Sequence, residues 1–142
     1  MNIAIGGDHA GFEYKEVLIV WLTEKGHEVK DFGPFSNDSC DYPDFAHPLA
    51  AAVANKTYNI GILICGSGNG VCITANKHTD IRAALCWEVE LASLSRQHND
   101  ANIIGIPSRF VDIEKTKQMI QAFIDTPFEG GRHQKRVNKI NL

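Results

Sequence analysis

Residues 62–77 read ILICGSGNGVCITANK and show the pattern of a strand, a tight turn and a helix in succession. The apolar run 60–65 precedes three glycines at positions 66, 68 and 70, after which a short helix is predicted. Glycine lets the backbone turn sharply, so that successive amide N–H groups can point into one concavity and bind an anion. Cys65 ends the predicted strand, at the edge where open α/β sheets bind their ligands. The pattern therefore places a thiol beside an anion site.

The composition indicates one soluble domain. The 142 residues, 44% of them hydrophobic, can bury one sizeable core, and no repeat or linker divides residues 1–142. The first ten residues lack the pattern of a signal peptide, and no apolar run approaches the ~20 residues of a membrane span. Four cysteines, at positions 40, 65, 72 and 86, form no CxxC pair, which argues against a zinc site and a disulfide framework. We therefore expect a cytoplasmic protein with reduced thiols.

Charge is unevenly distributed along the chain, whose formal net charge is −3. Residues 129–142 hold four of the 14 basic side chains and one of the 17 acidic ones. Residues 126–142 are thus a basic C-terminal tail, which favours an anionic ligand. Nucleic acid is a weak candidate, because the basic segment is short and has no interleaved aromatic residues. A small phosphorylated molecule fits better, and neither nucleic acid nor a membrane is expected as a partner.

Apolar runs alternate with helical patterns along the chain. Strands are predicted at residues 2–6, 27–32, 60–65, 82–86 and 102–106, and helices at 12–25, 45–56, 88–97 and 112–125, with the short helix after residue 70. Pro48 lacks the N–H that an interior helical position donates, so the second helix is expected to begin near His47 or to be distorted there. Alternating strands and helices are typical of a parallel sheet covered on both faces. The sequence therefore predicts an α/β fold, a doubly wound three-layer αβα sandwich with a five-stranded parallel sheet, and a tail without a core pattern of its own.

Polar side chains are predicted at both edges of that sheet. Asp8 and His9 follow the first strand, and Cys65 ends the third. Because the carboxyl ends of parallel strands share an edge, these three side chains should meet. His98 precedes the fifth strand and should lie on the opposite edge, unless a loop or a second subunit brings it to Cys65. A site completed by two subunits would explain this arrangement.

Six short motifs occur in an order that resembles a known family. They are GGDHAG at 6–11, DYPDFA at 41–46, ICGSGNG at 64–70, ANK at 75–77, SRQHNDAN at 95–102 and GGRHQKRV at 130–137. Together they closely resemble ribose-5-phosphate isomerase type B over nearly the whole chain. The resemblance implies a Rossmann-like cytoplasmic enzyme that needs no metal or other cofactor. It also implies a homodimer in which both subunits build each active site, with a tetramer as an open alternative.

For the chemistry, the resemblance implies the interconversion of D-ribose 5-phosphate and D-ribulose 5-phosphate in the pentose phosphate pathway, through a cis-enediolate. Cys65 matches the family's base, and His98 matches the residue that opens the sugar ring. Ser67 and the amide groups of the glycine loop would stabilise the enediolate oxygen. The positions that match substrate contacts are Asp8, His9, Tyr42, Gly66, Gly68, Asn69, Gly70 and Asn99, with Arg132 and Arg136 as a phosphate clamp and Arg109 as its helper.

Several alternatives stay open on the sequence. Some family members carry a glutamate base directly after the glycine loop, but Val71 stands there in this chain, which matches the branch that uses Cys65. Galactose-6-phosphate isomerase is a relative that divides these features between two chains, so their presence in one chain favours the ribose enzyme. Allose 6-phosphate or another six-carbon substrate remains an alternative. A non-catalytic sugar-phosphate binding module is a second class of function, and a redox thiol protein is a third.

Some of these residues also have a purely structural interpretation. Asp8 could cap the first helix, and Tyr42 could belong to the core. Cys72 and Cys86 are interpreted as inert buried side chains, and Cys40 as an exposed loop thiol. His133 is equally compatible with packing of the tail and with contact to the ligand.

Overall fold

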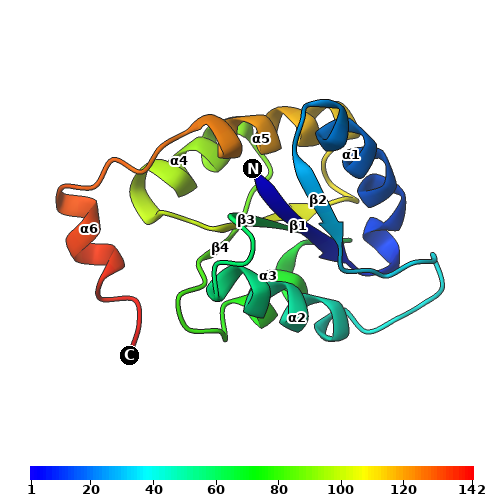
Figure 1. Ribbon diagram of the computed structural model, residues 1–142, viewed down its shortest axis with the longest axis horizontal. Helices are drawn as coiled ribbons and strands as arrows, with labels where there is room; N and C mark the ends of the chain where they lie inside the picture. The colour runs from blue at the N-terminus through cyan, green and yellow to red at the C-terminus, as the bar shows by residue number, and fades with distance from the viewer.

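A five-stranded sheet forms the centre of the computed structural model, which describes residues 1–142 (Figure 1). Its strands are β1 (Asn2–Gly7), β2 (Glu28–Asp31), β3 (Ile60–Cys65), β4 (Ala83–Leu85) and β5 (Ile103–Pro107), in the order β2-β1-β3-β5-β4. Every pairing is parallel, which confirms the predicted parallel sheet. The chain passes from β1 to β2 on one side and reaches β3 on the other side of β1. Sheets of this kind bind ligands at such a switch point, beside the carboxyl ends of the strands.

Helices cover both faces of the sheet (Figure 1). The helices α1 (Phe12–Glu24), α4 (Val89–Asn99) and α5 (Ile113–Asp125) lie on one face, and α2 (Pro43–Ala54) and α3 (Asn69–Ala75) lie on the other. A single 3-10 turn, η1 (His9–Gly11), joins β1 to α1, and α6 (Arg132–Val137) lies in the C-terminal tail. The predicted three-layer αβα sandwich is confirmed. No helix in the structure has the length and apolar character required to span a bilayer.

The central strands are buried on both faces, as expected for a parallel sheet between two helical layers. Because side chains alternate along a strand, Ile62 and Ile64 pack toward α1, α4 and α5. Leu63 and Cys65 pack toward α2 and α3. The side chain of Cys65 therefore points into the layer that holds the helix following the glycine loop.

The start of the second helix was predicted wrongly. The helix α2 begins at Pro43, before the predicted start at residues 45–47, and continues through Pro48 without a break. Proline is tolerated in the first helical turn, where its missing N–H has no intrahelical acceptor, so Pro43 favours this start. Pro48 removes one interior hydrogen bond, but burial of Leu49 and Val53 against the sheet keeps the helix continuous.

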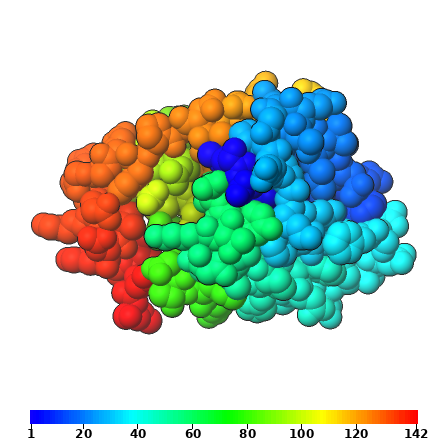
Figure 2. All heavy atoms as spheres, in the orientation of Figure 1, coloured from blue at the N-terminus to red at the C-terminus, as the bar shows by residue number.

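The tail forms the short helix α6 and contributes one buried side chain. The His133 side chain is buried, and its ring stacks on that of His98 with 4.3 Å between the ring centroids. This single imidazole contact has no apolar periodicity, which explains why the sequence showed no core pattern here. Figure 2 shows the tail (red) and the loop between β2 and α2 (cyan) at opposite ends of the molecule.

Candidate active site

A cleft of about 1000 Å³ opens beside the carboxyl ends of β1, β3 and β5. Its walls come from the turn after β1, the loop before α2, the glycine loop after β3 and the segment after β5. The lining residues are Asp8, His9, Ala10, Cys40, Asp41, Tyr42, Pro43, Asp44, Cys65, Gly66, Ser67, Gly70, Arg109 and Phe110. The structure thus brings Asp8, His9 and Cys65 together at the edge where the sequence placed them.

Backbone contacts fix the strand ends around this cleft. The Asp8 N–H donates to the Ile64 carbonyl at 3.1 Å, which joins the end of β1 to that of β3. The Ser108 N–H donates to the Cys65 carbonyl at 2.9 Å, and the Ser108 hydroxyl donates to the Ala10 carbonyl at 2.8 Å. One residue after β5 therefore connects all three segments, so the floor of the cleft is preorganised by the fold.

Cys65 is the thiol at the base of the cleft. Its Sγ accepts the Gly68 N–H at 3.1 Å, and Gly68 has the left-handed φ of 75° that glycine adopts without strain. This hydrogen bond holds the Cys65 sulfur beside the glycine loop. Burial raises the pKa of Cys72 to about 12 and that of Cys86 to about 11, so these two thiols remain protonated at neutral pH.

The glycine loop presents backbone donors to the cleft. The amide N–H groups of Gly66, Ser67 and Gly70 have no acceptor within the chain. The Asn69 N–H is used locally, since it donates to the Ser67 hydroxyl at 3.3 Å. The Tyr42 ring lies against Gly70, where a Cβ atom would stand 2.5 Å from the ring Cζ, so only glycine fits under the ring. Three free N–H donors near a thiol can stabilise an oxyanion or a phosphate.

The loop before α2 fixes the tautomer of His9. The Cys40 N–H donates to His9 Nδ1 at 3.2 Å, so this nitrogen carries no proton and the ring proton lies on Nε2. The Cys40 Sγ lies 3.9 Å from the same nitrogen, and Cys40 is half-buried in the cleft wall. The prediction of an exposed loop thiol was therefore wrong. No sequence pattern predicts this contact, because the loop has no periodicity that would define its path.

Asp8 caps the 3-10 turn that precedes the first helix and also lines the cleft, whereas the N-cap of α1 itself is Gly11, without a side-chain hydrogen bond. The Asp8 Oδ1 accepts the Ala10 N–H at 2.9 Å, which caps the η1 turn. Tyr42 is a cleft residue with 38% of its surface exposed, so its alternative placement in the core is wrong. Arg109 is anchored through its N–H, which donates to the Gly66 carbonyl at 3.1 Å, and its side chain is exposed in the cleft.

The remaining predicted site residues lie outside this cleft. His98 is in the last turn of α4, and the exposed Asn99 lines a different cavity of about 550 Å³ together with residues 140–142 of the tail. Arg132 and Arg136 are exposed on α6 and form no ion pair within the chain. Asn69 faces a hollow beside Trp87. Within one chain these residues lie apart from the Cys65 cleft, and His98 is outside it, as its place before the fifth strand predicted.

His98, Glu129 and His133 form a cluster whose donor atoms lie within 4.8 Å of one another. Their types suit a transition metal, but the two imidazole planes are nearly parallel, at 12° to each other. Ring nitrogens bind metals in the plane of the ring, so two stacked rings cannot share one ion unless a ring rotates. Burial, then the neighbouring His98 and Arg132, lower the pKa of His133 below its usual value. A neutral packing partner for His98 explains this geometry better than a metal ligand.

Comparison with known proteins decides the family. Residues 3–140 match the family model described as Ribose/Galactose Isomerase. The chain belongs to the ribose/galactose isomerase family. It is similar to ribose-5-phosphate isomerase B of Escherichia coli (strain K12), at 47% identity over 139 residues that cover 98% of this chain and 93% of that protein. Membership in this family makes the chain an isomerase.

Solved structures of family members have the same fold. Ribose-5-phosphate isomerase B of Clostridium thermocellum superposes with a TM-score of 0.97 at 44% identity, covering 99% of this chain and 95% of that one. Ribose-5-phosphate isomerase B of Mycoplasma genitalium, solved with bound ribulose-5-phosphate, gives a TM-score of 0.94 at 42% identity, covering 98% of this chain and 93% of that one. Membership in the family was thus predictable from the six motifs.

Proposed function

We propose that this family member is a cytoplasmic aldose-ketose isomerase that interconverts D-ribose 5-phosphate and D-ribulose 5-phosphate in the pentose phosphate pathway. The observation that supports this most directly is the pairing of the Cys65 thiol with free N–H donors in one cleft. The names of the relatives support the substrate, and one relative was solved with the ketose product of this reaction.

Cys65 would act as the base of the isomerisation. Its thiolate takes the proton from C2 of the open-chain aldose and returns it to C1 through a cis-enediolate. The proton of the O2 hydroxyl passes to O1 in the same interconversion, so that the carbonyl moves from C1 to C2. The Gly68 N–H donates to the Cys65 sulfur and holds it in position. The Ser67 hydroxyl and the free N–H groups of the loop stabilise negative charge on the enediolate oxygen, where a preorganised donor is most effective.

The phosphate requires cationic and N–H donors at the far end of the substrate. His9 offers its Nε2–H and Arg109 its guanidinium within the cleft. We infer that Arg132 and Arg136 complete the clamp from a second subunit, because they lie at the other end of their own chain. Bidentate contacts from arginine suit a phosphate group.

Ring opening is assigned to His98 of the second subunit. Most ribose 5-phosphate is a closed ring, so a group must move a proton from the anomeric hydroxyl to the ring oxygen before C2 becomes acidic. His98 has the imidazole that this transfer needs, and Asn99 beside it can hydrogen-bond the sugar. A homodimer with shared active sites follows, since neither residue lines the Cys65 cleft of its own chain. Two such dimers could associate further into a tetramer.

A six-carbon sugar phosphate is the second candidate substrate. The family covers galactose as well as ribose isomerases, and the cleft of about 1000 Å³ leaves room for a longer sugar. The same bases and N–H donors would serve either substrate. A non-catalytic binding module would need neither Cys65 nor His98.

The deciding experiment measures isomerase turnover of D-ribose 5-phosphate, allose 6-phosphate and galactose 6-phosphate in the presence of EDTA. We expect turnover of the ribose substrate that falls by about 10²- to 10⁴-fold in Cys65→Ala, the range for loss of a general base. Cys86→Ala is the matched control, because this buried thiol lies outside the cleft. Turnover of a six-carbon substrate alone would change the substrate and keep the base. Absence of turnover with all three would favour the binding module.

A further inference from the structure

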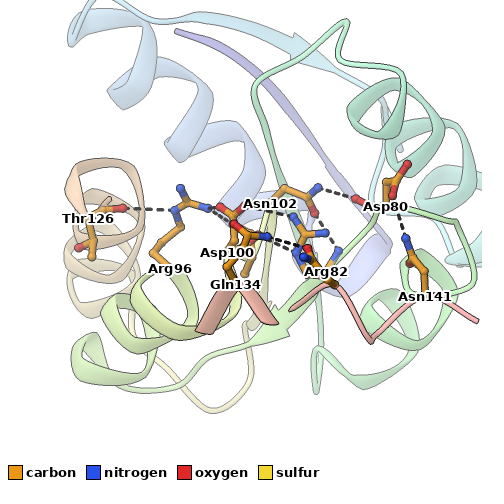
Figure 3. Close-up of polar contacts among 10 residues, drawn as sticks. Asp80, Arg82, Arg96, Asp100, Asn102, Thr126, Gln134 and Asn141 are labelled. Carbon is orange, nitrogen blue, oxygen red and sulfur yellow. Dashed lines mark hydrogen bonds and ion pairs between the residues drawn. The ribbon is translucent and has the colours of Figure 1, made fainter. Parts of the chain in front are cut away.

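A network of polar contacts holds the turn that follows α4, and Asp100 is at its centre (Figure 3). The Asp100 Oδ1 accepts from Arg96 at 2.9 Å, and its Oδ2 accepts from Arg82 at 3.4 Å. Its backbone carbonyl accepts the Arg82 Nε–H at 2.9 Å. The carboxylate thus lies between two guanidinium groups, in the residue directly after His98 and Asn99.

Arg96 connects this turn to the beginning of the tail. Its Nε–H donates to the Thr126 carbonyl at 3.3 Å, one residue beyond α5, and its guanidinium lies 5.6 Å from the centre of the Phe123 ring. A second contact supports the same connection, since the Glu129 N–H donates to the Gln97 carbonyl at 3.1 Å. The start of the tail is therefore fixed relative to the end of α4.

Arg82 connects the same turn to the end of the tail. Its N–H donates to Asn102 Oδ1 at 2.9 Å, and the Asn102 amide donates to the Asp80 carbonyl at 2.8 Å. The Asp80 carboxylate then accepts from Asn141 at 2.9 Å. The helix α6 thus lies between two anchored points, and both anchors lead to an arginine that Asp100 holds (Figure 3).

The residue type at position 100 is informative. Asp100 has a φ of 46° and a ψ of 45°, the left-handed conformation that glycine or asparagine adopts at the end of a helix more readily than aspartate. Arg82 and Arg96 are only 20% and 19% exposed, so both cations depend on an anionic partner. The backbone conformation at position 100 does not favour aspartate, but the need to pair Arg82 and Arg96 with an anion does.

We propose that Asp100 is a positioning residue, which orients His98, Asn99 and the arginines of α6 for entry into the cleft of the partner subunit. This inference rests on the proposed function, because it assigns Asp100 to the half-site that His98 contributes. Asp100 lies outside the Cys65 cleft of its own chain, and both of its carboxylate oxygens accept from arginines. Loss of its charge removes the anionic acceptor of each guanidinium and leaves both with backbone acceptors alone, which loosens the turn that carries His98 and Asn99.

The first test is Asp100→Asn, which keeps the shape and suits the left-handed conformation but removes the charge. We expect kcat/KM for ribose 5-phosphate to fall by about ten- to a hundredfold, since displacing a catalytic group by ~1 Å can reduce the rate by about 10². The rate of Cys65 alkylation should be unchanged, because the cleft end of the molecule is built separately. Asp80→Asn is the matched control: Asp80 also has a left-handed φ, of 68°, but its carboxylate accepts from the neutral Asn141 and should be replaceable.

Subunit mixing separates positioning from a general loss of structure. A mixed dimer of Asp100→Asn with Cys65→Ala contains one site with an intact cleft and an intact His98 turn, so activity should rise above that of either parent. A mixed dimer of Asp100→Asn with His98→Ala contains no such site and should stay at the level of Asp100→Asn or below. Recovery in neither mixture, or native activity of Asp100→Asn, would overturn the proposal.

The design distinguishes failure of this inference from failure of the proposed function. Suppose that Cys65→Ala and His98→Ala restore activity when mixed, while Asp100→Asn and Cys65→Ala do not. The active sites would then be shared between subunits, and the proposed role of Asp100 would be wrong. If the native chain does not isomerise ribose 5-phosphate, the proposed function falls first. Should Asp100→Asn fail to fold, Arg82→Gln removes one partner of the same carboxylate and must show the same mixing pattern.

Discussion

The end of the molecule around Cys65 is held by backbone contacts between buried strands, whereas the end around His98 and α6 is held by contacts between partly exposed charged side chains. The first arrangement is stable in a single chain, because parallel strands fix their carboxyl ends to one another. The second arrangement also presents Arg132 and Arg136 outward on α6, and neither arginine forms an ion pair within the chain. Under the proposed function, the fold of one chain supplies the base and the oxyanion donors, while the contribution of the tail depends on charge and on a partner subunit.

The largest effect is expected when the Cys65 end is inactivated in one subunit and the His98 end in the other. Cys65→Ala and His98→Ala should each reduce kcat by about 10²- to 10⁴-fold, because each removes an acid or base. After equilibrated subunit exchange of equal amounts, mixed dimers with one native site should restore roughly a quarter of the native activity, as expected for a symmetric dimer with two shared sites. Turnover of ribose 5-phosphate before and after exchange measures this recovery.

Exchange must be demonstrated independently, for example with two differently tagged subunits. If tagged subunits exchange and activity stays at the level of the parents, His98 acts within its own chain or not at all. The difference between the Cys65 end and the His98 end would then not reflect a division of the active site between subunits.

A smaller effect is expected from the tail alone. Arg136→Ala should raise KM by about ten- to a hundredfold, since a hydrogen bond to a charged group contributes ~1.5–3 kcal/mol. The change in kcat should be smaller, because the phosphate is remote from the reacting carbons. Lys135→Ala is the control, as it removes an equally exposed charge from the adjacent position of α6. Equal effects of both changes would show that the general charge of the tail matters, and not a specific clamp at Arg136.

The sequence predicted the cleft end better than the tail end, for a physical reason. Strands β1, β3 and β5 are apolar runs whose ends are marked by glycine or proline, so their positions and the meeting of Asp8 with Cys65 follow from local patterns. The order β2-β1-β3-β5-β4 does not follow from them, because the apolar pattern of a strand says nothing about its neighbours. Pro48 was misleading because burial of α2 outweighed its local preference.

The contacts that no pattern predicted are between single polar groups. The Cys40 N–H that fixes the His9 tautomer belongs to a loop whose path depends on the whole fold. The stacking of His133 on His98 and the position of Asp100 between two arginines join segments that are far apart in the sequence or lack periodicity. Such contacts form only after the sheet has brought the segments together, so a single sequence contains no local signal for them.

The smallest effect concerns the buried thiols Cys72 and Cys86, and it appears only at alkaline pH. Burial raises the pKa of Cys72 to about 12 and that of Cys86 to about 11, from an ordinary value of 9.0. Below pH 9.0 the folded and unfolded chains both keep these protons, so their burial contributes its full stability. Above that pH the unfolded chain releases protons that the folded chain retains, and the free energy of unfolding falls by up to about 1.4 kcal/mol per pH unit for each thiol.

Urea unfolding of the native chain and of Cys86→Ala, from pH 8 to pH 10.5, isolates one of these contributions. Lysines and tyrosines affect both proteins equally, so the decline should be shallower in Cys86→Ala by up to about 1.4 kcal/mol per pH unit. Equal declines would mean that the Cys86 thiol ionises in the folded state, and that the core between the sheet and α4 is more open than its burial indicates. A shallower decline in Cys86→Ala would show that this core excludes charge, in contrast to the end around His98, where charged side chains make the contacts.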